Sequence, residues 1–531
     1  MVRRIAAILF FLAVALAAVA PIRSYDYFWH LAAGRWIVDH RALPPMDPLA
    51  VASAKSEWIN GEWLYEVGLQ SVQRTVGDHG ISIVNALLVA AIFTTGLWFR
   101  GAARGDGEPS PERAGAEVGG SLLIAAVAFA GASDRLGVRP ATAAAMLLVA
   151  GLILLRSHVT LRWLIFGYAI VSAIWINVHP SAILAPMLAL ATVIVDRKRL
   201  WVALASAAAL LINPFGWKGV VAPIQLTALI RSQEFVNAEW LPSPLSIFPL
   251  FYLTIAVAAI WFLVSDRRRE SLWRIGVFVV LAALAIRSVR NQGLYFAALP
   301  LLLPALTLRG KTLAGILAAC AVVPLAWVFQ HDSHQPGIDA TRFPVAAVHA
   351  LAALHLPGNI YNVDQFGGLL EWTFYPQRRA LTDGRNELFR DFIAEDARAH
   401  RDSRAWHALL ERYAVALAVD EYQSEKVEVM DVASGERRSL PASLVRYRRR
   451  DWALLAFDDA AMIFARRAAF PPESLSAHEY RYLVPDDPTI RYASPAIRDA
   501  ALSEMRRARN EIGASDVLRD MEKAALANRP N

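Results

Sequence analysis

The sequence is poor in charged residues and in cysteine. Only 19% of its 531 residues are Asp, Glu, Lys or Arg, against about 25% in an average soluble domain. Its single cysteine, Cys320, lies in an apolar run and excludes both an intrachain disulfide and a cysteine-based metal site. The sequence also lacks a P-loop, a dinucleotide fingerprint and a zinc signature, which argues against a nucleotide-driven pump.

Apolar residues make up 56% of the chain, and they gather in long runs before residue 330. A membrane-crossing helix needs about 20 such residues. We therefore predict a polytopic α-helical membrane protein with about eleven spans. The predicted spans are 4–22, 80–99, 119–133, 140–155, 163–179, 181–195, 200–213, 247–265, 273–289, 292–308 and 311–329.

The basic residues predict the orientation, because positive charges in short loops stay in the cytoplasm. With Arg3 and Arg4 inside, every alternate loop is basic, and an odd number of spans leaves the C-terminal domain outside. These loops contain Arg100, Arg104 and Arg113, then Arg156 and Arg162, then "DRKR" at 196–199, "DRRRE" at 266–270 and "RGK" at 309–311. We expect a multi-pass protein of the inner (cytoplasmic) membrane whose C-terminal domain is extracytoplasmic.

The basic residues and the first apolar run each allow an alternative interpretation. The net charge of +7 would suit a nucleic-acid partner, but topology explains it, so we predict the lipid bilayer as partner and no nucleic acid. The first run also resembles a signal peptide. Pro21, directly after the small residues "AVA", argues against cleavage there.

The pattern divides the chain into three parts. Residues 1–330 form the predicted transmembrane domain, with a first outer loop at 23–79. Residues 340–470 read as an extracytoplasmic α/β domain, and 471–531 as a helical tail. Short β-segments are expected at 358–363, 378–385, 413–420 and 452–467, the last as a hairpin around its central "DD".

Polar clusters collect at the predicted outer ends of the spans, where short loops usually avoid positive charge. Arg135, Arg139, Arg287 and Arg290 are the anomaly, and an anionic ligand such as a phosphate would explain them. The alternative is interfacial snorkelling, or pairing with Asp134 or Glu239. "NVHP" at 177–180 adds His179 to this side as a substrate-binding candidate.

The first outer loop is the densest of these clusters. "DYFWHLAAGRWIVDH" predicts a helix on which Asp26 and His30 share a face, and "LPPMDP" ends it. A second helix is expected at 60–74, beginning near Glu62. Asp26, His30, Asp47 and Glu62 are candidates for acid/base chemistry or for holding a divalent cation. The alternatives are that Asp47 caps a turn and that His30 is a satisfied interfacial histidine.

Two motifs of the C-terminal domain stand out. The glycine pair of "FGGLLEW" permits a close backbone approach. In "TDGR", Asp383 and Arg385 flank a glycine. One interpretation is contact with acceptor or donor, and the other is an ordinary turn with a local Asp–Arg pair.

This arrangement resembles the GT-C superfamily, the membrane glycosyltransferases that use polyprenyl-phosphate-linked sugars. The stretch "DYFWHLAAGRWIVDHRALPPMDP … EWINGEWLYE" resembles bacterial membrane proteins of that type. It is also distantly similar to the first loop of oligosaccharyltransferase catalytic subunits and protein mannosyltransferases. The oligosaccharyltransferase "WWD" motif has no match, since "EWL" at 62–64 and 239–241 differs from it.

The resemblance implies roles for particular residues. The first acidic residue of the outer loop, here Asp26, would act as the base toward the acceptor or help to bind Mg or Mn, with Asp47 as a second metal candidate. Arg287 and Arg290 would face the donor phosphate by their location. The implied reaction moves a sugar from a polyprenyl-phosphate-linked donor to a glycan, lipid or protein acceptor outside the cytoplasm. A transporter or flippase for a lipid-linked or anionic substrate, and a non-catalytic GT-C-like scaffold, are the alternatives.

Overall fold

The structure is a computed structural model that describes residues 2–99, 111–231, 238–264, 269–303, 311–331, 333–422, 426–430, 435–487 and 494–527. It divides into two compact units. The first unit comprises Met1–Ser24 and Ile59–Ile338, and the second comprises Tyr25–Trp58 and Asp339–Asn531. The sequence-based division thus needs one change: the first half of the outer loop folds with the C-terminal domain.

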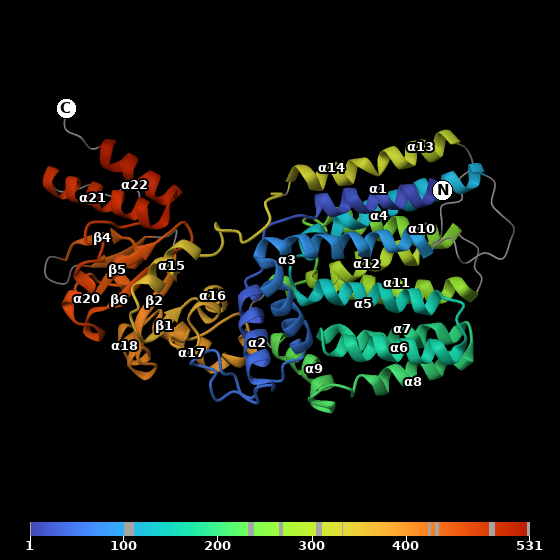
Figure 1. Ribbon diagram of the computed structural model, residues 1–531, viewed down its shortest axis with the longest axis horizontal. Coiled ribbons are helices and arrows are strands. Elements are labelled where there is room, and N and C mark those ends of the chain that lie inside the picture. The colour runs from blue at the N-terminus through green and yellow to red at the C-terminus, as the bar shows by residue number, and fades with distance from the viewer. Residues whose placement is uncertain are drawn as a thin grey trace. The chain divides into compact units, whose positions relative to one another are not determined.

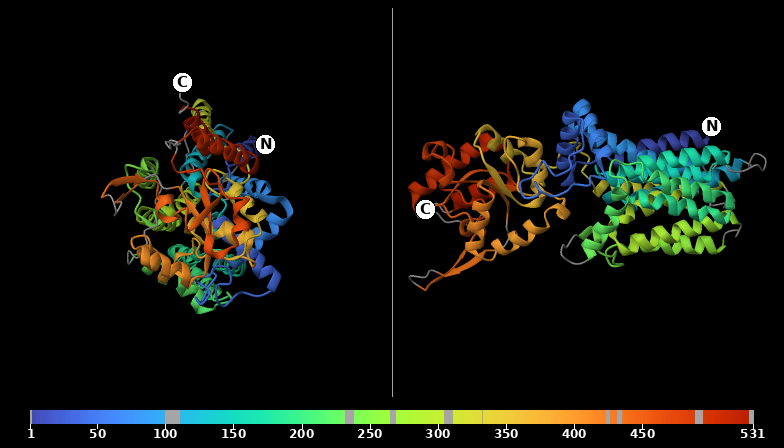
Figure 2. Two further views of the ribbon diagram at one scale, coloured as in Figure 1. Left: turned by 90° about the vertical axis from the view of Figure 1, so that its left-hand side faces the viewer. Right: turned by 90° about the horizontal axis from the view of Figure 1, so that it is seen from below.

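The first unit is helical, and its long helices run side by side (Figures 1 and 2). Each predicted span contains at least one helix. The α-helices are α1 (Val2–Ala17), α3 (Trp63–Phe99), α4 (Pro111–Ala132), α5 (Pro140–Arg156), α6 (Leu161–Ile176), α7 (Leu184–Ala191), α8 (Leu200–Ala209), α9 (Trp217–Arg231), α10 (Pro249–Val264), α11 (Arg269–Arg287), α12 (Gln292–Leu302), α13 (Lys311–Cys320) and α14 (Val322–His331).

Short 3₁₀ segments link or extend these helices. They are η1 (Ser133–Arg135), η2 (Pro180–Ile183), η3 (Thr192–Ile194), η4 (Arg197–Arg199), η5 (Ala238–Trp240) and η6 (Val289–Asn291). Some residues used in the predictions from the sequence lie outside the described ranges. They are 100–110, 234–237, 265–268 and 304–310, which include several of the basic loop residues.

Helix α3 joins the two helices predicted at 60–74 and 80–99. The joint is Gly77, whose φ of 66° and ψ of −176° depart from helical geometry. L-residues with side chains rarely adopt such a positive φ, so glycine permits the kink here. The amphipathic segment and the apolar segment therefore follow one another in one bent element.

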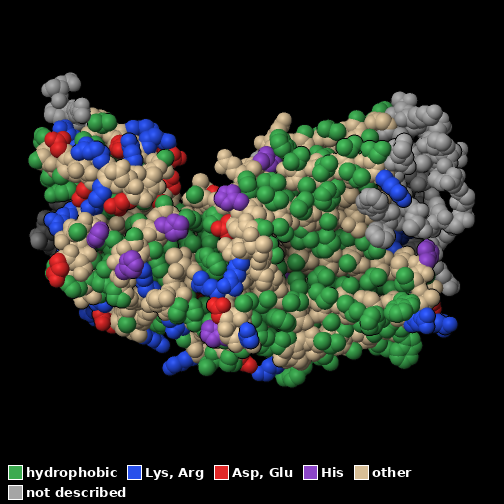
Figure 3. Space-filling view, viewed as in Figure 1, with side chains coloured by type: hydrophobic (Ala, Val, Ile, Leu, Met, Phe, Trp, Pro, Cys, Tyr) green, Lys and Arg blue, Asp and Glu red, His purple; other side chains and the backbone are tan. Residues whose placement is uncertain are grey.

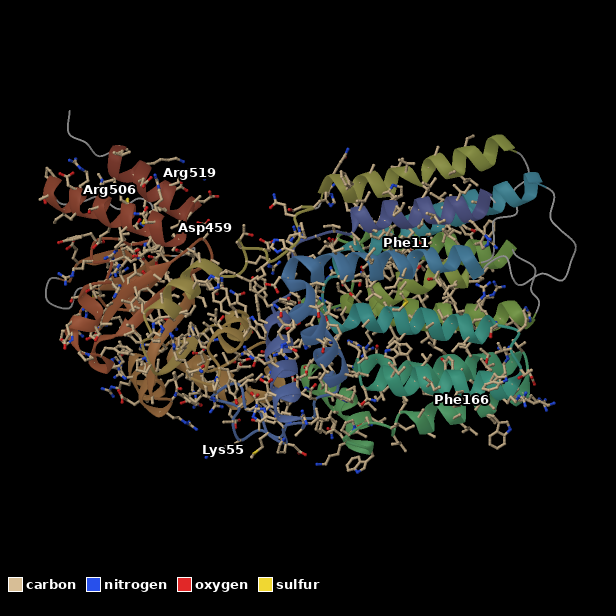
Figure 4. All side chains as sticks on the ribbon, in the orientation of Figure 1. Phe11, Lys55, Phe166, Asp459, Arg506 and Arg519 are labelled. Carbon is tan, nitrogen blue, oxygen red and sulfur yellow. The ribbon has the colours of Figure 1, made fainter. Side chains whose placement is uncertain are left out.

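Apolar side chains are both inside and outside this bundle. Its core contains closely packed rings such as Phe93 against Phe129, with centroids 5.7 Å apart. On the outside, large hydrophobic residues are exposed, among them Trp163 and Phe166, and hydrophobic atoms dominate the visible face of these helices (Figures 3 and 4).

Length and hydropathy single out one membrane-span candidate within the described ranges, Trp63–Leu97, with a mean hydropathy of 1.9. Six further apolar helices are shorter, with 10–17 residues each: Arg4–Ala17, Pro140–Arg156, Leu161–Ile176, Pro180–Ile194, Pro249–Leu263 and Gly315–His331. The helical architecture is therefore confirmed, whereas the count of eleven spans stays a prediction.

The second unit surrounds a small mixed sheet. Its helices are α2 (Asp26–His40), α15 (Val345–Ala353), α16 (Asp364–Phe374), α17 (Arg390–Ala399), α18 (Ser403–Arg412), α19 (Ala442–Arg446), α20 (Pro472–Ser476), α21 (Pro495–Ile512) and α22 (Asp516–Ala527), with η7 (Asn386–Leu388) and η8 (Arg467–Ala469). Its strands are β1 (Asn359–Asn362), β2 (Val415–Glu421), β3 (Val427–Met430), β4 (Arg437–Leu440), β5 (Trp452–Phe457) and β6 (Ala461–Arg466).

The four-stranded sheet has the order β1-β2-β6-β5, with β1 parallel to β2 and the other pairs antiparallel. Successive residues of β2, β5 and β6 are buried, apart from the last residue of β2 and of β6. Because neighbouring side chains of a strand point to opposite faces, both faces of this sheet are covered. The predicted hairpin is β5–β6, and its turn residue Asp458 accepts hydrogen bonds from the amides of Ala460 and Ala461.

Two features of this unit differ from the sequence-based expectation. Residues 378–385 do not form a strand; a single bridge joins Ala380 to Ile360, and the amides of Val51 and Ala52 then hydrogen-bond to this segment. The hairpin β3–β4 was not predicted, and it projects from the rest of the unit (Figure 2). The predicted tail helices pack on the domain, where Asp459 accepts hydrogen bonds from Ser515 and from the amide of Val517 (Figure 4).

Candidate functional site

Asp26 is the first residue of α2, and its side chain is half-buried. The indole Nε1 of Trp29, one helical turn later, donates a hydrogen bond to Asp26 Oδ1 at 3.1 Å. A carboxylate at a helix N-terminus is favoured by the unpaired amides and the dipole of the first turn. Its other flank is the turn at Gly384, where a Cβ atom would lie 3.0 Å from Asp26 Oδ1.

Three motifs that are far apart in the sequence meet around Asp26. Helix α16, which carries "FGGLLEW", packs against α2, as Figure 1 also shows. A Cβ atom at Gly367 would lie 1.9 Å from the carbonyl oxygen of Thr382, and one at Gly368 would lie 2.7 Å from the amide of Trp29. The glycine pair is therefore required for the approach of α16 to both the "TDGR" turn and α2.

Arg385 lies at the centre of a buried group of charges that we call the Arg385 cluster: Asp47, Glu371, Asp383 and Arg385. Its guanidinium donates to both carboxylate oxygens of Asp47, at 3.1 and 3.2 Å. Its Nε atom lies 2.9 Å from Asp383 Oδ1, and its Nη2 atom lies 3.8 Å from Glu371 Oε1. The Arg385 side chain is 2% exposed and the three carboxylates are fully buried.

Aromatic rings complete the surroundings of this guanidinium. The Arg385 Cζ atom lies 4.4 Å from the ring centre of Trp58 and 5.3 Å from that of Trp29. Such contacts suit the flat face of a guanidinium and keep water away from the ion pairs. The same Trp29 bonds to Asp26, so the cluster and the candidate base share one side chain.

The cluster holds more carboxyl groups than its one arginine can neutralise, and their pKa values move apart. Burial, and then the charge of Asp383, raise the pKa of Glu371 well above its usual range, while Arg385 only partly opposes this. Burial would also raise the pKa of Asp383, but Arg385 outweighs it and lowers that pKa. Burial therefore favours the protonated form of Glu371, whereas Arg385 favours the ionised form of Asp383.

Asp47 and His30, two residues with predicted roles, are both buried. Asp47 does cap a turn: its Oδ1 accepts from the Leu49 amide at 3.1 Å, and its Oδ2 accepts from the Ser53 hydroxyl. Both oxygens also bind Arg385, so a metal-ligand role does not fit this residue. His30 is buried on α2, with its ring 3.6 Å from that of Trp29.

A divalent cation remains a prediction from the resemblance. Within the described ranges, no group of three or more His, Cys, Asp or Glu side chains has a metal-binding arrangement. Asp26 thus belongs to no such group. The donor set does not fit an all-protein Mg or Mn site, and we derive no step through a metal.

Glu62 and His179 form a separate pair in the first unit. His179 Nε2 lies 3.9 Å from Glu62 Oε1. His179 Nδ1 accepts a hydrogen bond from the amide of Ser181 at 3.1 Å. In the neutral ring the proton must then sit on Nε2, facing Glu62. The neighbouring Trp63 donates to Asn177 Oδ1 at 2.7 Å, which fixes the start of α3 against the "NVHP" segment.

Three of the four predicted outer arginines gather around Glu239. Arg139 Nη1 donates to Glu239 Oε1 at 2.7 Å, and the guanidinium of Arg290 lies 4.4 Å from the ring centre of Trp240. Burial would raise the pKa of Glu239, but the charges of Arg139, Arg290 and Arg135 lower it. We call Arg135, Arg139, Arg290 and Glu239 the arginine–Glu239 cluster, and its net charge is positive.

Arg287 does not join this group. It is the exposed last residue of α11, and no ion pair to it is recorded within the described part of the chain. The pairing of Arg139 with Glu239 follows one of the two alternatives drawn from the sequence. The charges of Arg135 and Arg290 act on the same carboxylate.

Replacing Glu371 by Gln should weaken the pH dependence of stability. The folded protein keeps a proton that unfolded Glu, with a pKa of about 4.3, loses. The stability from this proton is complete below about pH 4 and falls as pH rises towards the folded pKa. Glu371→Gln cannot ionise, so the thermal midpoint of the purified chain should fall less between pH 5 and pH 8 than that of wild type.

Asp383→Asn is the matched control, because the pKa of Asp383 is lowered rather than raised. It removes an ionised partner from buried Arg385 and should cost about 3–5 kcal/mol at neutral pH. Equal pH slopes for Glu371→Gln and wild type would show that Glu371 is ionised in the folded protein.

Comparisons with known proteins come from structure alone, since neither a protein-family model nor a curated protein sequence matches the chain. The archaeal oligosaccharyltransferase AglB from Archaeoglobus fulgidus, in complex with an inhibitory peptide and a dolichol-phosphate, is similar over 98% of this chain and 86% of that one. Its TM-score is 0.56 at 12% identity. The apo form of that oligosaccharyltransferase gives a TM-score of 0.52 at 11% identity, with the same coverage.

The mycobacterial arabinofuranosyltransferase AftD is similar over 87% of this chain but 41% of that one, at 15% identity and a TM-score of 0.48. AglB and AftD are both GT-C glycosyltransferases. The likeness to the two AglB structures shows the fold, so the resemblance predicted from the sequence is confirmed at that level: the chain has a GT-C fold.

Proposed function

We propose that the chain is a membrane glycosyltransferase that moves a sugar from a polyprenyl-phosphate-linked donor to an extracytoplasmic acceptor. The observation that carries the proposal is the GT-C fold over nearly the whole chain. The AglB structure contains a dolichol-phosphate and an inhibitory peptide, which are a lipid phosphate and an acceptor-like molecule. A lipid-linked donor is therefore the substrate class that fits the fold.

The proposal places the first unit in the inner membrane with about eleven spans. Its support is the outer surface of this unit, where large apolar residues such as Trp163, Phe166 and Ile260 are more than half exposed. A soluble protein rarely exposes contiguous apolar surface of this kind. The basic loops orient the bundle, with "DRKR" at 196–199 in the cytoplasm and the second unit outside.

The arginine–Glu239 cluster is the proposed contact for the donor phosphate. Arginine matches the geometry of phosphate oxygens, and hydrogen bonds between two charged groups are the strong ones. Three arginines act on the one carboxylate of this cluster, and Arg139 forms an ion pair with it. Glu62 and His179 are proposed to contact the substrate on the same side of the membrane, with the His179 Nε2–H as a donor.

Asp26 is the proposed general base. It takes the proton of an acceptor hydroxyl while that oxygen attacks the anomeric carbon of the donor sugar. The bond between the anomeric carbon and the phosphate oxygen breaks, and the polyprenyl phosphate leaves with the electron pair. Attack opposite to the leaving group inverts the anomeric centre. Trp29 and the Gly384 turn hold the carboxylate from two sides, and His30 lies one helical turn further along α2.

Asp26→Asn should abolish most of the transfer. The amide keeps the size and the hydrogen-bond acceptor of the side chain but cannot take a proton, so the rate should fall about 10²- to 10⁴-fold. The measurement compares cell-envelope glycans and accumulated lipid-linked sugars in cells with wild-type or variant protein. An unchanged glycan profile at equal protein level would favour the transporter or scaffold alternatives and remove the catalytic assignment.

Arg290→Gln should weaken donor use rather than the chemical step. Loss of one charged contact to phosphate predicts an increase in the donor KM of about tenfold, with a smaller effect on kcat. Arg162→Gln is the matched control, because this exposed arginine lies in a predicted cytoplasmic loop. The assay uses purified protein, a short-chain polyprenyl-phosphate sugar and a saccharide acceptor. The phosphate assignment fails if both variants change the donor KM equally.

The orientation predicts the behaviour of topology reporters. Alkaline phosphatase fused after residue 531 should be active, because it folds only outside the cytoplasm, whereas a fluorescent protein at that point should stay dark. Insertion of each reporter after Arg199, in the basic 196–199 loop, should give the reverse result. An even number of spans would place both sites on the same side and would reverse the first outcome.

A further inference from the structure

A short linker, residues 333–338, follows α14 at the end of the first unit. The end of this linker pairs with the segment that follows α1. The carbonyl of Gly337 accepts a hydrogen bond from the amide of Ile22 at 2.7 Å, and a parallel bridge joins Ile22 to Ile338. The amide of Gly337 donates to Ser82 Oγ on α3 at 3.0 Å. The end of the linker is therefore held by backbone bonds that do not depend on pH.

His334 holds the beginning of the linker through its side chain. Its Nδ1 atom lies 3.1 Å from the carbonyl oxygen of Val19, and its Nε2 atom lies 2.7 Å from that of Phe329. The imidazole also stacks on the Phe329 ring, with 4.2 Å between the ring centres. Val19 follows α1, and Phe329 belongs to α14, which packs along α1 (Figure 1). One histidine thus bridges the first and the last helix of the first unit.

Both partners of the His334 ring are hydrogen-bond acceptors. A backbone carbonyl cannot donate, so each ring nitrogen must carry a hydrogen for both bonds to form. The neutral imidazole has a hydrogen on only one nitrogen, whereas the imidazolium has one on each. The two contacts of His334 therefore form together only when the ring is protonated.

The surroundings of this ring favour a positive charge. Phe329 is one of the last four residues of α14, whose carbonyls have no partner within the helix. Val19 lies two residues beyond the last residue of α1. The carbonyl end of a helix has a partial negative charge, and a protonated histidine there is stabilising. The face of the Phe329 ring adds a further attraction for a cation.

The other histidines near the linker have different positions. His331 is the last residue of α14, and its Nδ1 atom lies 2.8 Å from the carbonyl oxygen of Trp327 in the same helix. His79 lies on α3 beside Gly337, where a Cβ atom would be 3.1 Å from its Nε2 atom. Neither ring has a recorded contact with two carbonyls in the described part of the chain, so both serve as matched controls.

Charged groups on the neighbouring elements complete these surroundings. Asp78 on α3 accepts a hydrogen bond from Gln73, and Asp339 accepts one from Thr341. Arg23 precedes the second unit, and Asp332 lies outside the described residues. The helices that pack against α14 are α1, α4 and α13. Their charged residues all belong to the first two turns: Arg3, Arg4, Glu112, Arg113, Glu117 and Lys311.

We propose that His334 is a proton-dependent clamp that fastens the linker to the carbonyl ends of α1 and α14. The clamp is complete at low pH, because both ring nitrogens then donate. As pH rises the ring loses one hydrogen, and it keeps the shorter bond, to Phe329, while the bond to Val19 is lost. Histidine is the side chain whose charge normally changes between pH 5 and pH 8. The linker is therefore freer at pH 8 than at pH 5.

A nitroxide spin label on the linker tests this device in the purified full chain in detergent. Cys320 is the single cysteine, so Cys320→Ala followed by Gln335→Cys gives one labelling site on an exposed linker residue. The ratio of mobile to immobile label in the electron paramagnetic resonance spectrum should rise about tenfold from pH 5 to pH 8, since one charge-assisted hydrogen bond is lost. No transfer activity is measured, so the result is independent of the proposed function.

Variants assign the response to one side chain. His334→Gln does not titrate and has one donor nitrogen instead of two, so the label should be mobile at both pH values. His331→Gln and His79→Gln should keep the response of the parent protein. A label at Ser403→Cys, on an exposed residue of α18, should give the same spectrum at pH 5 and pH 8.

Four results would overturn the inference. They are equal mobility of the linker label at both pH values, a response that persists in His334→Gln, a response that disappears in either control variant, or an equal response of the label on α18. The comparison of pH values in the parent protein needs no change at His334. It therefore tests the clamp even when His334→Gln lowers the yield of folded protein.

Discussion

The second unit depends on one buried guanidinium. Arg385 binds Asp47 and Asp383 and lies close to Glu371, so it connects the early loop, the helix α16 and the "TDGR" turn. A buried ion that loses a partner typically costs about 3–5 kcal/mol, which is a large share of the stability of a domain. Together with the packing of α2 against α16, this connection explains why the early segment Tyr25–Trp58 folds with a domain whose remainder begins at Asp339.

The position of Asp26 follows from this constraint. The Arg385 cluster fixes the turn at Gly384 and holds Trp29 and Trp58 beside the guanidinium. Trp29 then donates to Asp26, and the glycine pair of α16 allows the three backbones to approach. A catalytic base needs a supporting shell that limits its freedom. For Asp26, the proposed base, this shell is a charge cluster that is itself closed to solvent and takes no proposed part in the chemistry.

Local patterns predicted the elements well and their long-range partners poorly. The sequence predicted the helix at Asp26–His40, the two helical segments that α3 joins, and the β5–β6 hairpin, because periodicity and turn residues act over a few positions. The Asp383–Arg385 pair was anticipated for the same reason. The ion pair between Arg385 and Asp47 joins residues 338 positions apart, and no local sequence pattern predicts it. Residues 378–385 looked like a strand, yet they pair with the loop at Val51 and Ala52 instead.

Arginine serves two opposite purposes in this chain, and the number of neighbouring carboxyl groups distinguishes them. At Arg385 three acids surround one guanidinium. Its charge is therefore neutralised within the protein, and it stabilises the fold. Around Glu239, by contrast, three arginines act on one carboxylate and lower its pKa. A local excess of positive charge has an electrostatic cost that an anionic ligand removes. The balance of charge within each cluster, rather than the presence of arginine alone, therefore separates the structural site from the place where we propose that the donor phosphate binds.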